Sequence, residues 1–448
     1  MINFLKSEQH AKTVDDPKEI DEAYKYWRFH IMFTMYIGYA VFYFTRKNFS
    51  YVMPAMIADL GLDKADIGMM GSLFYITYGC SKFFSGIISD RSNPRFFMGV
   101  GLIISGIINI LFGFSSSLLM LSILWILNAI FQGWGWPACS KLLTTWYSRS
   151  ERGFWWALWN TAHNVGGALI PLLIGYITLH YSWRYGFIIP GIIAIFVGLF
   201  LCWRLRDKPT TQGLPTIGHW RKDSLELAHE GEDLKLNHNE ILKKYVLTNK
   251  YIWLLAFSYT LVYIVRTAIN DWGNLYLTEQ YNYSLITANS ALSLFEVGGL
   301  MGSLVAGWSS DKIFGGNRGP VNLIFSIGIF LAISALWLIP VGGFVLQAAC
   351  FFTIGFFIFG PQMLIGMAAA ECSHKNAVGA ATGFVGLFAY MGAALSGYPL
   401  ALIMTEYQWT GFFTVITAAS AAIGLLLLPF LKAQSSQHTS DTIIYSQS

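Results

Sequence analysis

The sequence predicts an all-α integral membrane protein with twelve transmembrane helices in two six-helix bundles. Hydrophobic residues make up 54% of the 448 residues and charged residues only 12%, against roughly 25% charged in soluble domains. With 34 Phe, 23 Tyr and 16 Trp, a soluble fold could not hide its aromatic residues in cores. Apolar runs also recur from Phe29 to Leu431 with one long polar interruption near the middle of the chain. These observations exclude a set of soluble domains.

Each apolar run supplies the roughly 20 residues that a helix needs to cross the hydrocarbon core. Isolated charges are tolerated inside some of the runs, since a membrane helix that faces other helices can carry them. The predicted spans are residues 29–57, 66–89, 95–114, 117–139, 153–180, 184–203, 251–277, 285–309, 319–340, 342–370, 377–404 and 408–431.

The polar interruption separates six spans from six. Residues 204–250 are charged and contain two prolines, so they are predicted to be a linker between two bundles. The 28 residues before the first span have no apolar stretch of the signal-peptide type. The predicted organisation is an N-terminal segment 1–28, a bundle 29–203, the linker 204–250, a bundle 251–431 and a tail 432–448.

Lysine and arginine predict the orientation. If both termini lie on one side, that side holds 23 of the 29 basic residues, and the other side holds only Lys64 and Arg184. Basic residues concentrate in cytoplasmic loops. Both termini and the linker are therefore predicted to be cytoplasmic.

Several other classes of function are excluded. The five cysteines form no Cys-x-x-Cys pair, and no histidines stand at zinc-binding spacing, so neither a disulfide framework nor a metal site is expected. The net charge of +4 is modest and does not indicate nucleic-acid binding. There is no P-loop, nucleophile elbow or hydrolytic carboxylate pair, so we expect no enzyme and no cofactor.

The two halves of the chain repeat each other at an offset of 221 residues. The clearest match is a Gly-x-x-Ser-Asp-basic signature, Gly86 to Arg91 in the first half and Gly307 to Lys312 in the second. Each copy follows the second span of its half, where the glycine allows close helix contact and the aspartate can pair with basic neighbours. The signatures are predicted to form ion pairs at the cytoplasmic ends; their charged residues are Asp90, Arg91, Asp311 and Lys312.

Ionisable residues inside the spans are candidates for function, because each costs a few kcal/mol at membrane depth. Their balance is positive: four cations (Arg46, Lys47, Lys82 and Arg266) stand against the two acids Asp271 and Glu296. An excess of positive charge has no use against lipid. It predicts a water-filled pathway for anions.

The repeat places one arginine at an equivalent position in each half. The spacing Tyr-x-x-x-Tyr-x-x-Arg occurs at Tyr39, Tyr43 and Arg46 and again at Tyr259, Tyr263 and Arg266. These offsets place the three side chains on one helix face. Arginine keeps its charge and donates two parallel hydrogen bonds to a phosphate or carboxylate, so the pair is predicted to bind one phosphate. The alternative is that the arginines only neutralise the two acids.

Three further residues leave alternatives open. His163 by itself is typical of a structural histidine, but its presence beside the arginines favours contact with the substrate. Asp271 and Glu296 are either proton carriers or, as we prefer, ion-pair partners in a gate.

The chain resembles the organophosphate:phosphate antiporters of the major facilitator superfamily from about Tyr26 to the end of the last span, and most closely the hexose-phosphate transporters and sensors of UhpC type. The fold implied is two six-helix bundles related by an axis along the membrane normal. The resemblance rests on the motifs Tyr-Phe-Thr-Arg-Lys-Asn-Phe (43–49), Tyr-Gly-Cys-Ser-Lys-Phe (78–83), Ser-Asp-Arg-Ser-Asn-Pro-Arg (89–95), Phe-Gln-Gly-Trp-Gly-Trp-Pro (131–137), Trp-Asn-Thr-Ala-His-Asn-Val-Gly-Gly (159–167), Asn-Asp-Trp (270–272) and Gly-Asn-Arg-Gly-Pro (316–320).

The resemblance implies exchange of a hexose phosphate, glucose 6-phosphate, for inorganic phosphate by a monomer in the cytoplasmic (inner) membrane. It implies that Arg46 and Arg266 bind the phosphate. The further residues that it implies to contact substrate are Lys82, His163, Tyr39, Tyr43, Tyr78, Trp136, Asn160, Tyr263 and Tyr390.

One departure from the family bears on the substrate. Some hexose-phosphate transporters of this type carry an acid and a lysine in helix 11, whereas residues 377–404 here contain no charge. The family also includes a sensor that binds external glucose 6-phosphate and signals to a membrane histidine kinase. The sequence contains no kinase module, and both roles stay open.

Overall fold

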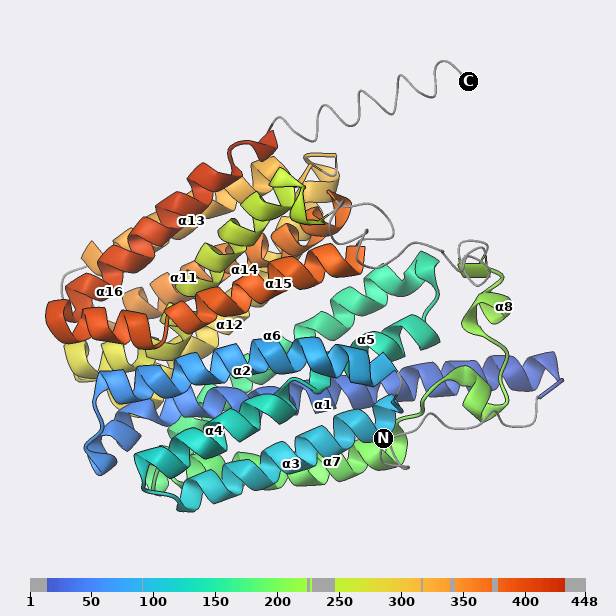
Figure 1. Ribbon diagram of the computed structural model, residues 1–448, viewed down its shortest axis with the longest axis horizontal. Coiled ribbons are helices and arrows are strands. Elements are labelled where there is room, and N and C mark those ends of the chain that lie inside the picture. Colours follow the sequence, from blue (N-terminus) through green and yellow to red (C-terminus); the bar gives the residue numbers. More distant parts are fainter. Residues whose placement is uncertain are drawn as a thin grey trace. The chain divides into compact units, whose positions relative to one another are not determined.

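The computed structural model describes residues 14–90, 92–223, 226–227, 246–315, 317–338, 343–372 and 378–431 (Figure 1). All regular elements in these ranges are helices, as predicted. They are α1 (Pro17–Leu60), α2 (Lys64–Asp90), α3 (Pro94–Phe114), α4 (Leu118–Gln132), α5 (Gly135–Trp146), α6 (Arg149–His180), α7 (Tyr185–Arg204), the 3₁₀ helix η2 (Pro209–Gln212), α8 (Ile217–Arg221), α11 (Lys250–Tyr281), α12 (Leu285–Lys312), α13 (Arg318–Leu338), α14 (Phe344–Glu371), α15 (Val378–Leu395) and α16 (Tyr398–Leu427).

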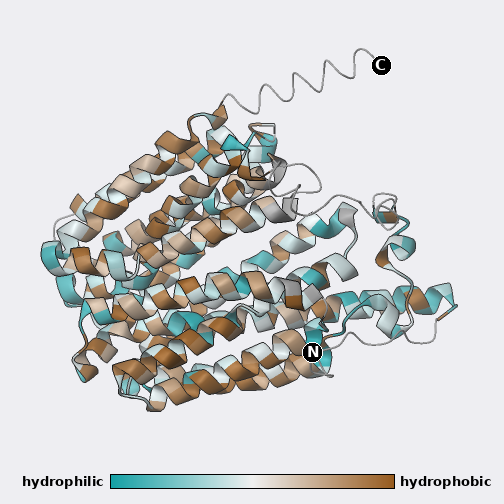
Figure 2. Cartoon of the chain, viewed as in Figure 1, coloured by the Kyte–Doolittle hydropathy of each residue, from teal (hydrophilic) through white to brown (hydrophobic). Residues whose placement is uncertain are grey.

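The chain is a multi-pass membrane protein. Within the described ranges, nine helical stretches are long and apolar enough to cross a membrane. One of them, Ala381–Leu427, has 47 residues and covers the two last predicted spans, with a break of helical geometry at Gln408 (φ 53°). α1 and α2 are not among the nine, and they carry three of the four intramembrane cations predicted above, Arg46, Lys47 and Lys82. Figure 2 shows the hydrophobic character of α3 and α7 and the hydrophilic first turns of α1. Twelve spans are consistent with these helices.

Local sequence explains where several helices begin and end. The side chain of Asn93 accepts a hydrogen bond from Arg95 N at 3.0 Å and precedes Pro94 at the first position of α3, and Asn249 caps α11 in the same way through Tyr251 N at 3.0 Å. Capping of this kind satisfies backbone donors that a helix start leaves open. Asn282 ends α11 in the left-handed region (φ 53°), a conformation that asparagine tolerates.

The described residues divide into two compact units. The first unit lies within residues 1–52 and 77–235, and the second within residues 53–76 and 236–448. The end of α1, the turn and the start of α2 (53–76) therefore belong to the second unit, together with α11 to α16. The hydroxyl of Ser72 in this tip donates to Ala394 O at 2.6 Å and accepts from Tyr398 N at 2.7 Å. The predicted transmembrane limits of the two bundles, 29–203 and 251–431, stay a prediction.

In the first unit, glycines bring α3 and α7 into backbone contact. A Cβ on Gly106 would lie 2.6 Å from Gly191 O, and one on Gly191 would lie 2.7 Å from Gly106 O. Small residues permit such contact, and close packing rather than hydrophobic burial drives helix association within lipid. Larger side chains at these two positions would separate the helices.

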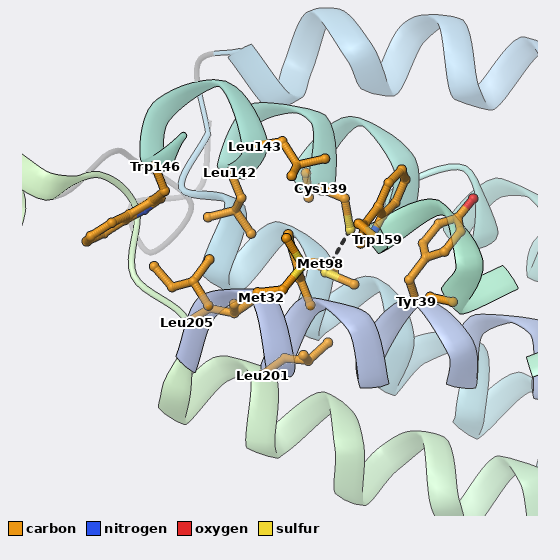
Figure 3. Packing of buried hydrophobic residues seen from close by; sticks show 14 of the residues in the cluster. Met32, Tyr39, Met98, Cys139, Leu142, Leu143, Trp146, Trp159, Leu201 and Leu205 are labelled. Atoms are coloured by element: carbon orange, nitrogen blue, oxygen red, sulfur yellow. Dashed lines mark hydrogen bonds between the residues drawn. The ribbon is translucent and has the colours of Figure 1, made fainter. Parts of the chain in front are cut away.

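The core of the first unit packs α1 against α3, α5, α6 and α7. Figure 3 shows part of it, with Cys139 and Met98 joined by a contact of 3.7 Å between their sulfur atoms. Tyr39 and Trp159 lie at one end of the cluster in this view. This end of the core borders the candidate site.

In the second unit, α12 and α14 also pack through glycines. Gly298 and Gly302 stand one helical turn apart on α12, and a Cβ on either would overlap the backbone carbonyls of Phe352 and Phe356 on α14. Gly355 of α14 meets Phe295 of α12 in the same way. Two helices at this separation form a rigid pair that supports the residues between them and α11.

The start of α1 and the first part of the linker, up to α8, pack together as a cap on one end of the first unit. The sequence had predicted these segments only as a polar N-terminal segment and a linker. α1 begins at Pro17, well before the apolar span that starts at residue 29, because Tyr24 docks on the linker. Its hydroxyl donates to Pro215 O at 2.5 Å, and its ring stacks on Trp220 with centroids 4.3 Å apart. Hydropathy does not predict this extension of α1, because tertiary contacts stabilise it.

Arg28 lies at the centre of this cap. Its guanidinium forms an ion pair with Glu151 at 2.6 Å and lies 4.8 Å from the ring centroid of Tyr147 and 5.3 Å from that of Trp220. Burial raises the pKa of the Tyr147 phenol well above its usual range, so its hydroxyl remains a donor, to Arg28 O at 2.7 Å. Arg221 of α8 also reaches Glu151, at 3.2 Å.

Replacing Arg28 by alanine is expected to lower the thermal unfolding temperature of the purified protein by several degrees. The Arg28 and Glu151 side chains are only 11% and 16% exposed. The change therefore removes cation–π contacts and one of the two arginines that pair with Glu151, of which Arg221 remains, at a cost of about 1–3 kcal/mol. The control is Lys25→Ala, which breaks an ion pair of 2.6 Å whose side chains are 71% and 44% exposed and should change little. Equal unfolding temperatures for the two variants would contradict a structural cap.

Candidate functional site

Arg46 of α1 is buried against tyrosines of the first unit. Its guanidinium carbon lies 4.2 Å from the ring centroid of Tyr43 and 4.9 Å from that of Tyr78 on α2, and the residue is 8% exposed. Aromatic faces attract a cation without neutralising it. The guanidinium is thus oriented by its neighbours and keeps its charge.

Buried amides position this part of α1; Asn48 and Gln132 stand in motifs quoted above, whereas Asn109 and Asn128 belong to none of them. Asn109 of α3 and Asn128 of α4 donate to Thr45 O at 3.1 and 2.8 Å, and Gln132 donates to Thr45 Oγ1 at 2.8 Å. Asn48 in turn donates to Asn109 Oδ1 at 2.9 Å. Polar groups satisfied in this way hold one backbone arrangement, so the turn that carries Arg46 has a defined place.

Lys82 of α2 lies over Trp136 of α5. Its ammonium is 4.5 Å from the ring centroid. The flanking serines hold α2 against the break between α4 and α5, because Ser81 donates to Ile130 O at 2.5 Å and Ser85 to Gly133 O at 2.8 Å. The break lies inside the span predicted at 117–139, which matches the apolar stretch Leu118–Trp146.

The first unit also contains the other predicted contacts on α1 and α6. The ring of His163 lies 5.8 Å from that of Tyr43, and the residue is 6% exposed. Tyr39 lies between Tyr43, at 6.0 Å, and Trp159, at 4.7 Å. Asn160 is on the face of α6 that carries His163. The predicted residues of the first half therefore gather in one cluster.

Arg266 of α11 has a similar environment in the second unit. Its guanidinium carbon lies 4.5 Å from the centroid of Phe359 on α14 and 5.7 Å from that of Tyr263. Tyr263 lies 4.9 Å from Tyr259 and 5.8 Å from Tyr390 on α15. Each half thus holds an arginine against aromatic rings, as the repeated spacing predicted.

The two intramembrane acids contact neutral donors in the second unit. Asp271 accepts a hydrogen bond from the Tyr75 hydroxyl at 2.5 Å, and Glu296, 1% exposed, accepts one from Asn270 at 3.1 Å. Tyr75 belongs to the tip of residues 53–76. The two acids stay candidates for the gate.

The signature at the end of α12 forms an ion pair with Arg318, a residue quoted above only within a motif. Arg318 donates to the Asp311 carboxylate and, at 2.9 Å, to Ser310 Oγ. Lys312 is exposed. In the first half, Arg91 and the side chain of Asp90 lie outside the described residues.

A second group, which the sequence did not bring together, joins Lys64 in the tip of residues 53–76 to Glu279 of α11 and Trp409 of α16. Lys64 forms an ion pair with Glu279 at 2.7 Å and lies 4.8 Å from the ring centroid of Trp409, whose Nε1 also donates to Glu279 at 3.1 Å. Lys64 was one of only two basic residues counted on its side of the membrane. That rarity was the one signal that could have found the group.

In the part of the chain that the structure describes, no three His, Cys, Asp or Glu residues come close enough to hold a metal ion. Two cations that the sequence places inside the spans of the first half, Arg46 and Lys82, lie against aromatic rings. Such an arrangement suits an anion that carries a less polar body.

Comparison with known proteins identifies the same class. Residues 35–397 match the family model described as Major Facilitator Superfamily. The chain is 62% identical over 97% of its length to the "Membrane sensor protein UhpC" of Escherichia coli (strain K12), of which the match covers 99%. It is 49% identical to the "Probable hexose phosphate transport protein" of Chlamydia pneumoniae, over 95% of this chain and 96% of the relative.

A solved structure has the same fold. A bacterial homolog of the human lysosomal transporter Spinster, in an inward-facing and occupied conformation, superimposes with a TM-score of 0.72 over 91% of this chain and 97% of that chain. The two sequences are 14% identical, so this likeness supports the fold alone.

Proposed function

Because the chain belongs to the Major Facilitator Superfamily and to its UhpC-type proteins, we propose that it is an antiporter that exchanges a hexose phosphate, glucose 6-phosphate, for inorganic phosphate by alternating access. The observation that carries the proposal is the buried Arg46 in its tyrosine contacts, with Lys82 and His163 in the same unit. Cationic side chains grouped in one unit suit an anionic ligand, and the two parallel donors of a guanidinium match the oxygens of a phosphate.

Arg46 and Arg266 each supply one guanidinium to the phosphate in this proposal. Lys82 and His163 add positive charge, and the hydroxyls of Tyr39, Tyr43, Tyr78, Tyr263 and Tyr390, with Asn160 and Trp136, contact the rest of the substrate. Relatives named for hexose phosphate transport and for glycerol-3-phosphate transport support a phosphorylated organic substrate. Asp271 and Glu296 act in the gate.

The transporter is proposed to be a monomer in the cytoplasmic membrane, with both termini cytoplasmic. The basis is the distribution of lysine and arginine, with 23 on the side of the termini and two on the other.

A sensor of external glucose 6-phosphate is the second candidate. One observation favours it, the 62% identity to a protein named as a membrane sensor. In this case the same cluster would bind the ligand, and the protein would report occupancy to a membrane histidine kinase.

The deciding experiment is counterflow of labelled phosphate in sealed liposomes that contain the purified protein. Uptake driven by internal phosphate and inhibited by external glucose 6-phosphate supports the antiporter. Binding of glucose 6-phosphate without any counterflow would refute transport and establish the sensor in its place.

Charge reversal at Asp311 is expected to separate binding from movement. Asp311→Arg breaks the contact with Arg318, so phosphate exchange should fall about tenfold or more, which corresponds to about 1.4 kcal/mol in the barrier. Equilibrium binding of glucose 6-phosphate should change by less than about threefold, since the residue ends α12 and is exposed. The charge swap Asp311→Arg with Arg318→Asp should recover exchange. Unchanged exchange in the single variant would exclude a role in the cycle.

A further inference from the structure

Two tryptophan rings meet at a corner in the first unit. The centroids of Trp136 on α5 and Trp156 on α6 are 6.0 Å apart, and their planes are inclined by 69°. Both residues are half-buried. Trp159, which contacts both rings, is fully buried and so cannot contact a ligand. The corner therefore presents aromatic surface that the packing of the unit leaves partly accessible.

The corner faces the cations and not the lipid. The ammonium of Lys82 lies 4.5 Å from the centroid of Trp136, and an ammonium avoids a hydrocarbon surface. Trp156 is seven residues before His163, so both lie on one face of α6. Phe154, 69% exposed, lies on a different face of the same helix. α6 thus has an apolar outer face and a separate face that carries Trp156 and His163.

The corner is backed by rigid packing. Trp159 lies 5.0 Å from Trp136 and 5.9 Å from Trp156, and Tyr39 supports it from α1 at 4.7 Å. Figure 3 shows Tyr39 and Trp159 near each other at the right end of the packed core. Aromatic contacts at these distances hold ring orientations. A ligand would meet a surface that is already formed, which lowers the cost of binding.

A pyranose ring has the chemistry that fits such a corner. One face of a hexose carries C–H groups with partial positive charge, and the face of an indole ring is negative. Hydroxyl groups at the edge of the sugar stay available to polar neighbours. Inorganic phosphate has no C–H group, and glycerol 3-phosphate has no ring. The corner can therefore distinguish substrates that the cations alone would bind equally.

Resting on the proposed function, we propose that Trp136 and Trp156 form the sugar-binding platform of this site and select pyranose phosphates over inorganic phosphate and glycerol 3-phosphate. The phosphate group lies at the cations, with Lys82 joining the two parts since it contacts Trp136. Trp156 is then a specificity-determining residue that touches the substrate.

The test measures binding of three ligands to the purified protein, so it applies equally to a transporter and a sensor. Trp156→Ala should raise the dissociation constant of glucose 6-phosphate about tenfold or more, equivalent to 1.4 kcal/mol, and change the constants of inorganic phosphate and glycerol 3-phosphate by less than about twofold. Trp156→Phe, which keeps an aromatic face and the packing, should lose only about threefold. Phe154→Ala, on the other face of α6, should leave all three constants unchanged.

Two outcomes would overturn the platform. A glucose 6-phosphate constant unchanged in Trp156→Ala excludes contact with the sugar. An equal loss for all three ligands in both Trp156 variants assigns the residue a structural role. A wild-type protein that binds neither phosphate nor glucose 6-phosphate would instead refute the proposed function itself, before any variant is compared.

Discussion

Arg46→Lys is expected to abolish phosphate exchange and phosphate binding while the protein remains folded in the membrane. Lysine keeps the positive charge but loses the planar fork, and each charge-assisted hydrogen bond to a bound phosphate is worth roughly 1.5–3 kcal/mol. The ammonium also lacks the flat surface that packs on Tyr43 and Tyr78, at 4.2 and 4.9 Å. Loss of one or two such bonds weakens binding by about tenfold to more than about ten-thousandfold. Labelled phosphate counterflow and direct binding measure the two effects.

Arg266→Lys should also abolish phosphate exchange and phosphate binding. Arg266 occupies the position equivalent to Arg46 in the repeat, and Phe359 and Tyr263 pack on its guanidinium. The matched control is Arg204→Lys, at an arginine that lies 5.6 Å from the ring centroid of Tyr26 and donates to its hydroxyl at 2.9 Å. That variant should exchange phosphate like the wild type. Wild-type phosphate affinity in both Arg46→Lys and Arg266→Lys would eliminate the paired arginines as the phosphate site.

Exchange is expected to exceed net uptake by about tenfold or more. A phosphate monoester carries about −1.5 to −2 charges at neutral pH, close to the excess of two positive charges inside the spans. Without a bound anion, this excess has to pass through the closed state uncompensated, and an added barrier of about 1.4 kcal/mol already slows reorientation tenfold. The measurement compares uptake of labelled glucose 6-phosphate into liposomes with and without internal phosphate.

Liposomes that contain sulfate in place of phosphate, at equal ionic strength, control for a general effect of internal anions. Phosphate-loaded liposomes should accumulate the label rapidly, and sulfate-loaded ones slowly. Equal initial rates in loaded and empty liposomes would rule out obligatory exchange.

Hydropathy predicted most of the helices because the membrane requirement is local. About 20 apolar residues in a row form a spanning helix whatever the rest of the chain does. The same criterion failed at α1, which begins at Pro17, because its polar first turns are held by Tyr24 and Arg28 against Trp220, about 190 residues away. The span predicted at 117–139 lies largely within the stretch Leu118–Trp146, but hydropathy did not show that α4 and α5 are separate helices there, with serines of α2 donating to Ile130 O and Gly133 O.

Helical periodicity predicted those features of the candidate site that lie on one face of a single helix. The spacing of Tyr39, Tyr43 and Arg46 predicted a common face, and the tyrosine contacts agree with it. Contacts between residues of different helices could not be predicted from it. Arg318 as the partner of Asp311 and Tyr75 as the donor to Asp271 join residues that no periodicity relates.

The sequence by itself determined the all-α membrane class, the internal repeat and the positions of the buried cations, because composition, period and charge are properties of the chain. The tertiary structure alone decided which side chains meet: the amides that hold Thr45 beside Arg46, the shared Glu151 in the cap, and the corner between Trp136 and Trp156. The physical reason is that a helix face is specified locally, whereas its neighbour depends on how the other helices pack.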